Sequence, residues 1–168
     1  GVGAVAGVVA ERALIGRNLR STPRDKEPFG SLSSAGIEVT CNDGVRIHAE
    51  VDEAFDVDDD ITVIFAHGYA LGMNEYHFQR RDLRHVSRMA FYDHRGHGKS
   101  GLGTRDSHNI WQLGHDLNSV IEKVAPSGDI VLVGHSMGGM SIQALAKSNP
   151  ELFGSRIKSV ILISTSSG

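Results

Sequence analysis

One short segment combines a serine with glycines at the spacing that a nucleophilic turn requires. The residues GHSMG at 134–138 have the form G-x-S-x-G and lie between an apolar run and an amphipathic segment. A sharp strand-to-helix turn places such a serine in a strained backbone conformation, with its hydroxyl projecting from the sheet. Side chains two residues before and after it would collide, which accounts for Gly134 and Gly138. We therefore expect Ser136 to be a nucleophile. A phosphate-binding helix start would need G-x-x-x-x-G-K-[ST] or G-x-G-x-x-G, and neither pattern occurs at this turn.

A second segment, HGY at 67–69, directly follows the apolar run 61–66. Acyl transfer needs backbone N–H donors directed at the oxyanion that forms in the transition state. One donor is expected from Met137, which follows the serine, and the other from the loop after an earlier strand. We assign the second donor to Tyr69 and expect His67, Gly68 and Tyr69 to contact the substrate. A plain strand-ending turn with a packed His67 is the alternative.

A third segment, DHRGHGKS at 93–100, also follows an apolar run. Its two histidines stand three residues apart in a glycine-rich loop, which would make a poor ligand cage. The chain has one cysteine, so no multi-cysteine zinc site can form. We expect no metal site, and instead expect Asp93 and Arg95 to hydrogen-bond loop backbone and support the turn at Ser136. Serine-based acyl transfer needs no organic cofactor either.

The elements around these segments alternate in a pattern typical of an α/β domain with a mostly parallel sheet and helices on both faces. Apolar and alternating runs predict strands at 37–40, 45–51, 61–66, 88–92, 130–133 and 159–163, the first two joined as a hairpin through Asp43-Gly44. Three- and four-residue spacing of apolar side chains predicts helices at 74–84, 110–124 and 137–148. The chemistry-bearing segments therefore all follow strands of one sheet.

Composition limits the class of partner. The net charge of −3 and pI near 6.3 argue against a nucleic-acid binder, which usually carries a basic patch. Residues 1–10 are uncharged but shorter than the ~18 apolar residues of a membrane span. We expect residues 1–35 to form an N-terminal helix and an extended arm, and residues 36–168 to form the α/β domain. A cytoplasmic protein is favoured, with membrane association through residues 1–10 as the alternative.

The three segments, in this order and spacing, resemble those of the α/β-hydrolase superfamily from about residue 36 onward. They look like its esterase and lipase-like members, and the stretch from Tyr69 to Arg81 is most similar to actinobacterial hydrolases of this fold. The resemblance implies a serine hydrolase of ester or related acyl bonds, acting on a small and hydrophobic acyl substrate. A serine at position 136 excludes the branches with an aspartate nucleophile. Perhydrolysis, C–C bond hydrolysis and a non-catalytic binding protein with the same fold are the alternatives.

The sequence departs from this family in one respect. Family members place the acid and then the histidine of the catalytic triad after the serine. After Ser136 this chain holds one acid, Glu151, which matches no acid position of the family, and no histidine. We interpret the chain as the N-terminal part of a hydrolase, lacking the C-terminal strands and the lid. By itself it is expected to be inactive, and its last strand is expected to expose an apolar edge.

Overall fold

The computed structural model describes residues 27–54 and 60–167 of the chain. The chain divides into two compact units, residues 1–31 and 32–168. The described part of the first unit is a turn in which the Ser31 N–H donates to the Pro28 carbonyl at 3.0 Å. The expected N-terminal helix lies outside the described residues, and the boundary at residue 35 stays a prediction. Within the described ranges, no helix has the length and apolar character needed to cross a membrane.

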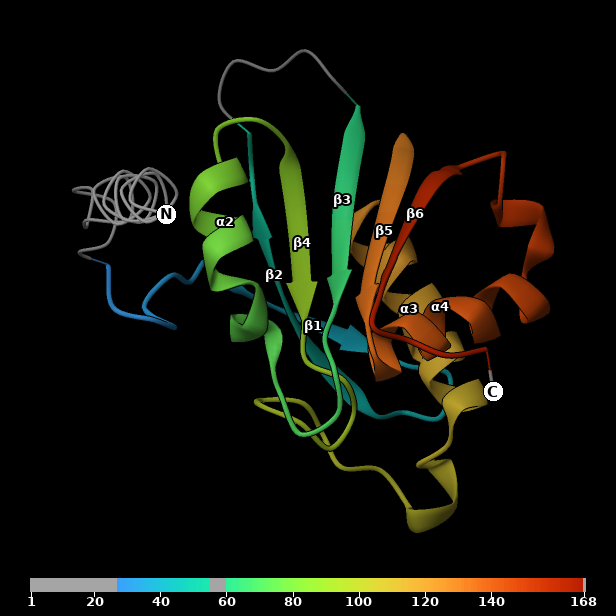
Figure 1. Cartoon of the computed structure of the whole chain (residues 1–168). Coiled ribbons are helices and arrows are strands. Elements are labelled where there is room, and N and C mark those ends of the chain that lie inside the picture. The colour runs from blue at the N-terminus through green and yellow to red at the C-terminus, as the bar shows by residue number, and fades with distance from the viewer. Residues whose placement is uncertain (1–26, 55–59, 168) are drawn as a thin grey trace, which may run out of the picture. The chain divides into compact units, whose positions relative to one another are not determined.

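The second unit is built on one mixed sheet of six strands, in the order β1-β2-β4-β3-β5-β6 (Figure 1). The strands are β1 (Gly36–Thr40), β2 (Arg46–Asp52), β3 (Ile61–Ala66), β4 (Arg88–Tyr92), β5 (Asp129–His135) and β6 (Ile157–Ile163). β1 and β2 form an antiparallel hairpin, and β2 is also antiparallel to β4. The remaining pairs are parallel. The predicted mostly parallel sheet with an N-terminal hairpin is therefore confirmed.

Helices cover both faces of this sheet, because successive strand residues point to opposite sides. Ile64 and Ala66 of β3 join the core under α3 (Ile110–Val124) and α4 (Met137–Ser148). Phe65, between them, packs on the other face beneath the 3-10 turn η2 (Met73–Tyr76), which leads into α2 (His77–Leu83). Because β3 pairs parallel with both β4 and β5, the carboxyl ends of these three strands lie at one edge of the sheet (Figure 1).

The segment predicted to be helical over 74–84 is helical in the structure, over residues 73–83. It is split into η2 and α2, and the side chain of Tyr76 at the junction donates a hydrogen bond to the Ala66 carbonyl at 2.9 Å. Trp111, near the start of α3, is 53% exposed, and the ammonium of Lys147 lies over its ring at 5.0 Å from the ring centroid.

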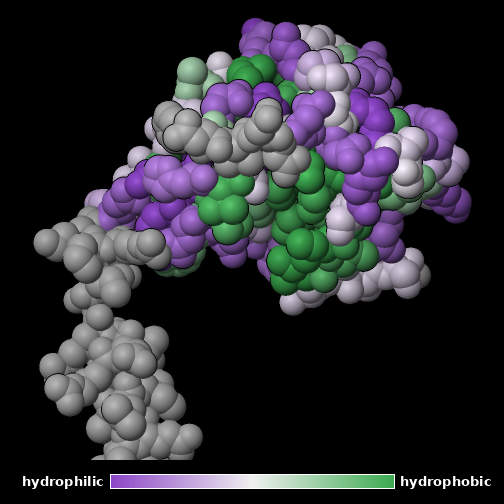
Figure 2. Space-filling model, turned by 90° about the horizontal axis from the view of Figure 1, so that it is seen from above, coloured by the Kyte–Doolittle hydropathy of each residue, from purple (hydrophilic) through white to green (hydrophobic). Residues whose placement is uncertain are grey.

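Strand β6 lies at one edge of the sheet, and no other strand of the described chain pairs with its outer side. Ile161, Leu162 and Ile163 are 49%, 47% and 40% exposed. Figure 2 shows a hydrophobic area on the side of the molecule where β6 lies. An unpaired apolar strand edge is a template for association with another chain.

We therefore expect the 168-residue chain to associate at micromolar concentrations, and Ile161→Lys to reduce this association by placing a charge on the exposed edge. Dynamic light scattering over a concentration series measures the effect. The control His115→Lys adds a charge at an exposed position on α3 and should leave the particle size unchanged. Equal behaviour of the two variants would show that the β6 edge does not drive association.

Candidate active site

Ser136 lies on the turn between β5 and α4, in a backbone conformation that residues other than glycine rarely adopt. Its φ and ψ angles are 49° and −114°. Such backbone strain costs about 1–3 kcal/mol and persists only where the surroundings fix it. Here the Ser136 N–H donates to the Ile163 carbonyl at 2.9 Å, and the Ser136 carbonyl accepts from the Thr165 hydroxyl at 2.7 Å. The ends of β6 and of the following segment thus hold the turn in place.

The glycines around the serine are required by close approach. A Cβ atom on Gly134 would lie 2.7 Å from backbone atoms of Gly138. A Cβ atom on Gly138 would overlap the Ala66 carbonyl oxygen and lie 2.9 Å from that of His67. The start of α4 therefore rests directly on the end of β3. This contact places the serine turn beside the loop that follows β3.

That loop leaves the backbone N–H of Tyr69 unused. The Gly68 N–H donates to Glu75 at 2.9 Å, the Ala70 N–H to His97 Nε2 at 3.1 Å, and the Leu71 N–H to the Gly68 carbonyl at 3.3 Å. Between them, the Tyr69 N–H has no acceptor among the described residues. The Gly68 carbonyl also faces His67 Nδ1 at 2.7 Å. Because the peptide is planar and trans, fixing this carbonyl turns the Tyr69 N–H to the opposite side.

Tyr69 and Met137 both line a cavity of about 180 Å³, together with side chains of α3 and neighbouring loops. Met137 is the first residue of α4, so its N–H is one of those that a helix start leaves without an intrahelical acceptor. Ile110 and Leu113 contribute the apolar part of the wall, and His97 contributes a ring edge. The cavity is thus an apolar space bordered by the two segments predicted to carry oxyanion donors.

Two histidines of the loops are buried and neutral. Burial lowers the pKa of His67, and it lowers the pKa of His94 further. His67 Nε2 accepts from the His94 N–H at 2.9 Å, so its proton resides on Nδ1, which donates to Gly68. His67 is fully buried, and its contact with a substrate stays a prediction. Its buried ring supports the loop through the hydrogen bonds to Gly68 and His94.

Asp93 joins two of the chemistry-bearing loops. Its carboxylate is almost fully buried and accepts the N–H groups of Met73 and Lys99, each at 2.9 Å. Its own carbonyl accepts from the Ser100 hydroxyl at 2.7 Å. Gly98, with φ of 49°, passes so close that a Cβ atom would overlap the Asp93 carboxylate. The carboxylate therefore bonds loop backbone in the way expected from sequence.

The side chain of Arg95 binds mainly carboxylates, whereas hydrogen bonds to loop backbone were expected. Its guanidinium donates twice to Asp116 at 2.6 Å and to Asp43 at 2.7 Å, and reaches the Ser107 carbonyl only at 3.5 Å. Burial disfavours its charge, but these hydrogen bonds outweigh that effect and raise the pKa of Arg95. Asp116 was missed from the sequence, although it lies on the apolar stripe of α3 beside Leu117. A carboxylate at such a position needs a buried partner.

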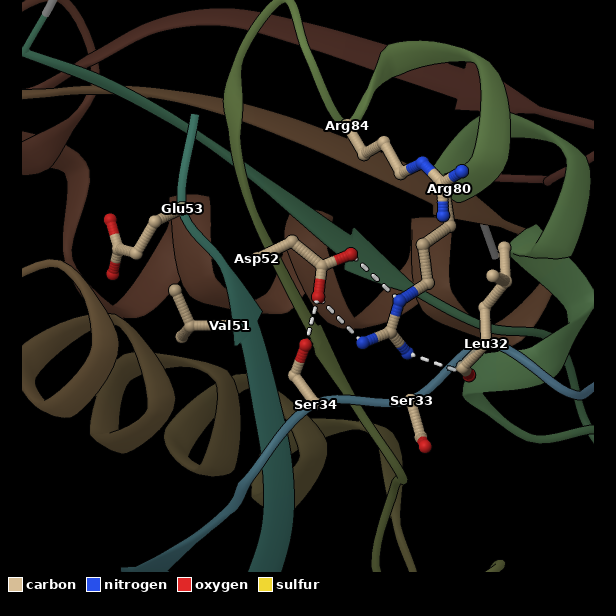
Figure 3. A pocket seen from close by; sticks show the side chains of 8 residues that line it. All are labelled: Leu32, Ser33, Ser34, Val51, Asp52, Glu53, Arg80 and Arg84. Carbon is tan, nitrogen blue, oxygen red and sulfur yellow. Dashed lines mark hydrogen bonds and ion pairs between the residues drawn. The ribbon is translucent and has the colours of Figure 1, made fainter. Parts of the chain in front are cut away.

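Figure 3 shows a second pocket, whose lining includes no residue of the serine turn. It is lined by residues of the 32–34 segment, the end of β2, and α2. Arg80 donates to Asp52 at 2.8 and 2.6 Å and to Glu50 at 2.8 Å, while Ser34 binds the same Asp52. These charges satisfy one another and tie α2 to β2. In the described ranges, no three side chains of His, Cys, Asp or Glu gather where they could hold a metal ion.

The chain is similar to known hydrolases in sequence and in structure. The family model described as serine aminopeptidase, S33, matches residues 58–167. Monoacylglycerol lipase from Mycolicibacterium smegmatis is 31% identical over 111 residues, which make up 64% of this chain and 39% of that protein. An esterase from Exiguobacterium antarcticum aligns with a TM-score of 0.69 at 23% identity, over 79% of this chain and 46% of its own. An esterase from Thermogutta terrifontis aligns with a TM-score of 0.66 at 24% identity, over 80% of this chain and 47% of its own. The chain spans less than half the length of each of these relatives.

The contact between α4 and β3 predicts how the turn responds to added side chains. Gly134→Val and Gly138→Val should each destabilise the fold by more than the ~1–3 kcal/mol of ordinary overpacking, because the obstructing atoms are backbone. Urea unfolding of the 168-residue chain measures the loss. Lys99→Ala is the control, since its exposed side chain makes only a 3.7 Å ion pair with Glu50. Wild-type midpoints for both valine variants would contradict the close contact.

Proposed function

The chain belongs to the serine aminopeptidase S33 family, and we propose that it carries the nucleophile and the oxyanion hole of a serine hydrolase of ester or related acyl bonds. The observation that carries this proposal is the strained Ser136 on a strand-to-helix turn, next to a loop in which the Tyr69 N–H has no acceptor among the described residues. Strain at a non-glycine residue is a feature of functional sites. No other described part of the chain combines these features.

The proposed reaction follows from these positions. Ser136 Oγ attacks the acyl carbon while a general base takes the hydroxyl proton. The carbonyl oxygen becomes an oxyanion, which the N–H groups of Tyr69 and Met137 stabilise by hydrogen bonds. Return of the proton to the leaving group releases an alcohol and leaves an acyl-serine ester. Water, activated by the same base, then releases the acid and restores Ser136.

We place the general base outside residues 1–168. No described residue hydrogen-bonds the hydroxyl of Ser136, and all nine histidines precede it in the sequence. Both ring nitrogens of His67 are engaged with backbone groups, and so are both of His97. His135, directly before the serine, faces Glu75. The base and its acid partner would come from polypeptide that completes the site.

The cavity beside Ser136 favours a small, hydrophobic acyl substrate. Its volume of about 180 Å³ and its apolar wall at Ile110 and Leu113 suit a short acyl chain better than a charged group. The relative from M. smegmatis is named a monoacylglycerol lipase, which supports an ester substrate. Perhydrolysis and C–C bond hydrolysis would use the same nucleophile and hole, so a substrate panel separates them from ester hydrolysis.

Ser136→Ala tests the nucleophile in the whole protein. It should lower hydrolysis of p-nitrophenyl butyrate by roughly 10⁴- to 10⁶-fold, the scale seen when a catalytic serine is removed, with the melting temperature largely preserved. More than a tenth of wild-type activity in the variant would refute the role of Ser136. A non-catalytic binding protein would show no Ser136-dependent turnover at all.

The 168-residue chain provides a second arm of this test. Without a base to accept the proton, Ser136 stays a weak nucleophile, and the chain should not turn over the ester. Circular dichroism establishes the folded fraction, and the Ser136→Ala form of the same chain supplies the background rate. Robust Ser136-dependent turnover would show that an upstream histidine acts as base.

Substitutions at position 69 separate backbone from side-chain roles. Tyr69→Phe should leave kcat largely intact, because the proposed donor is the backbone N–H. Tyr69→Pro deletes that donor and should cost on the order of 10²- to 10³-fold in kcat, the scale for losing one oxyanion donor. Steady-state kinetics on the folded whole protein measure both. A severe defect in the phenylalanine variant with a mild one in the proline variant would move the role to the phenol hydroxyl.

A further inference from the structure

We propose that Glu75 is a positioning residue that holds the Tyr69 loop against the Ser136 turn through a two-sided carboxylate contact. One carboxylate oxygen, Oε2, accepts the Gly68 N–H at 2.9 Å. The other, Oε1, contacts Nδ1 of His135. Gly68 directly precedes Tyr69, and His135 directly precedes Ser136. The inference rests on the proposed function, because it assigns a task within the same site.

The two segments that Glu75 joins touch each other as well. A Cβ atom on Gly68 would lie 2.8 Å from Nδ1 of His135, so the imidazole packs on the bare face of this glycine. The side chains of Glu75 and His135 are only 19% and 28% exposed. Partial removal from water strengthens the hydrogen bond from the Gly68 N–H to the Glu75 carboxylate. Glu75 therefore lies between the loop and the turn and sets the distance between them.

The element that carries Glu75 is itself fixed. Its own N–H donates to the Gly72 carbonyl at 2.9 Å within η2. On either side, the Met73 N–H donates to Asp93 and the Tyr76 hydroxyl donates to the Ala66 carbonyl, each at 2.9 Å. The 3-10 turn that split the predicted helix is thus anchored to the ends of β3 and β4. Such a platform can position the carboxylate reproducibly.

This arrangement predicts a specific kinetic signature. The Tyr69 N–H engages the substrate oxygen most strongly when negative charge develops in the transition state. A displaced loop should therefore lower kcat and leave KM nearly unchanged. Misplacement by about 1 Å can cost up to about 10²-fold in rate. We expect Glu75→Ala to lower kcat by about 10- to 100-fold with KM within threefold of wild type.

The experiment uses the whole protein, p-nitrophenyl butyrate, and active-site titration to express kcat per competent site. Binding of a trifluoromethyl ketone, which forms an oxyanion on reaction with serine, should weaken in parallel with kcat. Glu75→Gln keeps an oxygen that can accept the Gly68 N–H but loses the charge that faces His135, and should fall between Glu75→Ala and wild type. His135→Asn offers an amide donor near the Nδ1 position and should retain more activity than His135→Ala. A role in stability alone would not produce this order.

Glu50→Gln is the matched control, because Glu50 is a buried carboxylate that also accepts a backbone N–H, from Ser34 at 2.9 Å. It should lower the melting temperature without changing kcat per site. If Ser136→Ala abolishes turnover but the Glu75 and His135 variants keep wild-type kcat per site, the positioning role is overturned while the nucleophile assignment stands. If Ser136→Ala remains active, both the nucleophile assignment and the positioning role fail. If Glu75→Ala is insoluble, the kcat values of Glu75→Gln and of the two His135 variants decide the question. Equal kcat for His135→Asn and His135→Ala would overturn the positioning role of Glu75.

Discussion

The close contact between the start of α4 and the end of β3 is the constraint on which the site depends. Gly138 lies so near the Ala66 carbonyl that no side chain fits between them. Because of this contact, the strand-to-helix turn cannot relax away from the loop after β3. Tyr69 and Met137, the residue that directly follows Ser136, consequently border one space, although they come from segments nearly 70 residues apart.

Long-range polar contacts then fix the backbone that this packing brings together. The strained conformation of Ser136 is held by the Ile163 carbonyl and the Thr165 hydroxyl. Asp93 accepts the backbone N–H groups of Met73 and Lys99, and Glu75 accepts the N–H of Gly68. The Ile163 carbonyl and the carboxylates of Asp93 and Glu75 replace water as acceptors of backbone N–H groups, so removing one of them would leave an unsatisfied donor. Together they make the arrangement rigid before any substrate arrives.

Local periodicity was sufficient to predict most elements, and the bounds at 61–66, 88–92, 110–124 and 137–148 agree with the structure. These segments are apolar or amphipathic along their whole length, so burial and propensity favour the same conformation. What could not be predicted depends on contacts distant in sequence. Asp116 finds its partner Arg95 across the core, and η2 departs from the α-helix where Tyr76 is bound to β3. No local pattern encodes the position of Glu75 between Gly68 and His135.

The most direct test of the account is a crystal structure of the whole protein after reaction with a p-nitrophenyl alkylphosphonate, which forms a stable analogue of the tetrahedral intermediate. The account predicts a covalent bond to Ser136 Oγ, with the phosphonyl oxygen about 2.7–3.1 Å from the backbone nitrogens of Tyr69 and Met137. The alkyl group should occupy the cavity lined by Ile110 and Leu113. A phosphonyl oxygen directed away from both nitrogens, or an adduct on a different residue, would contradict it.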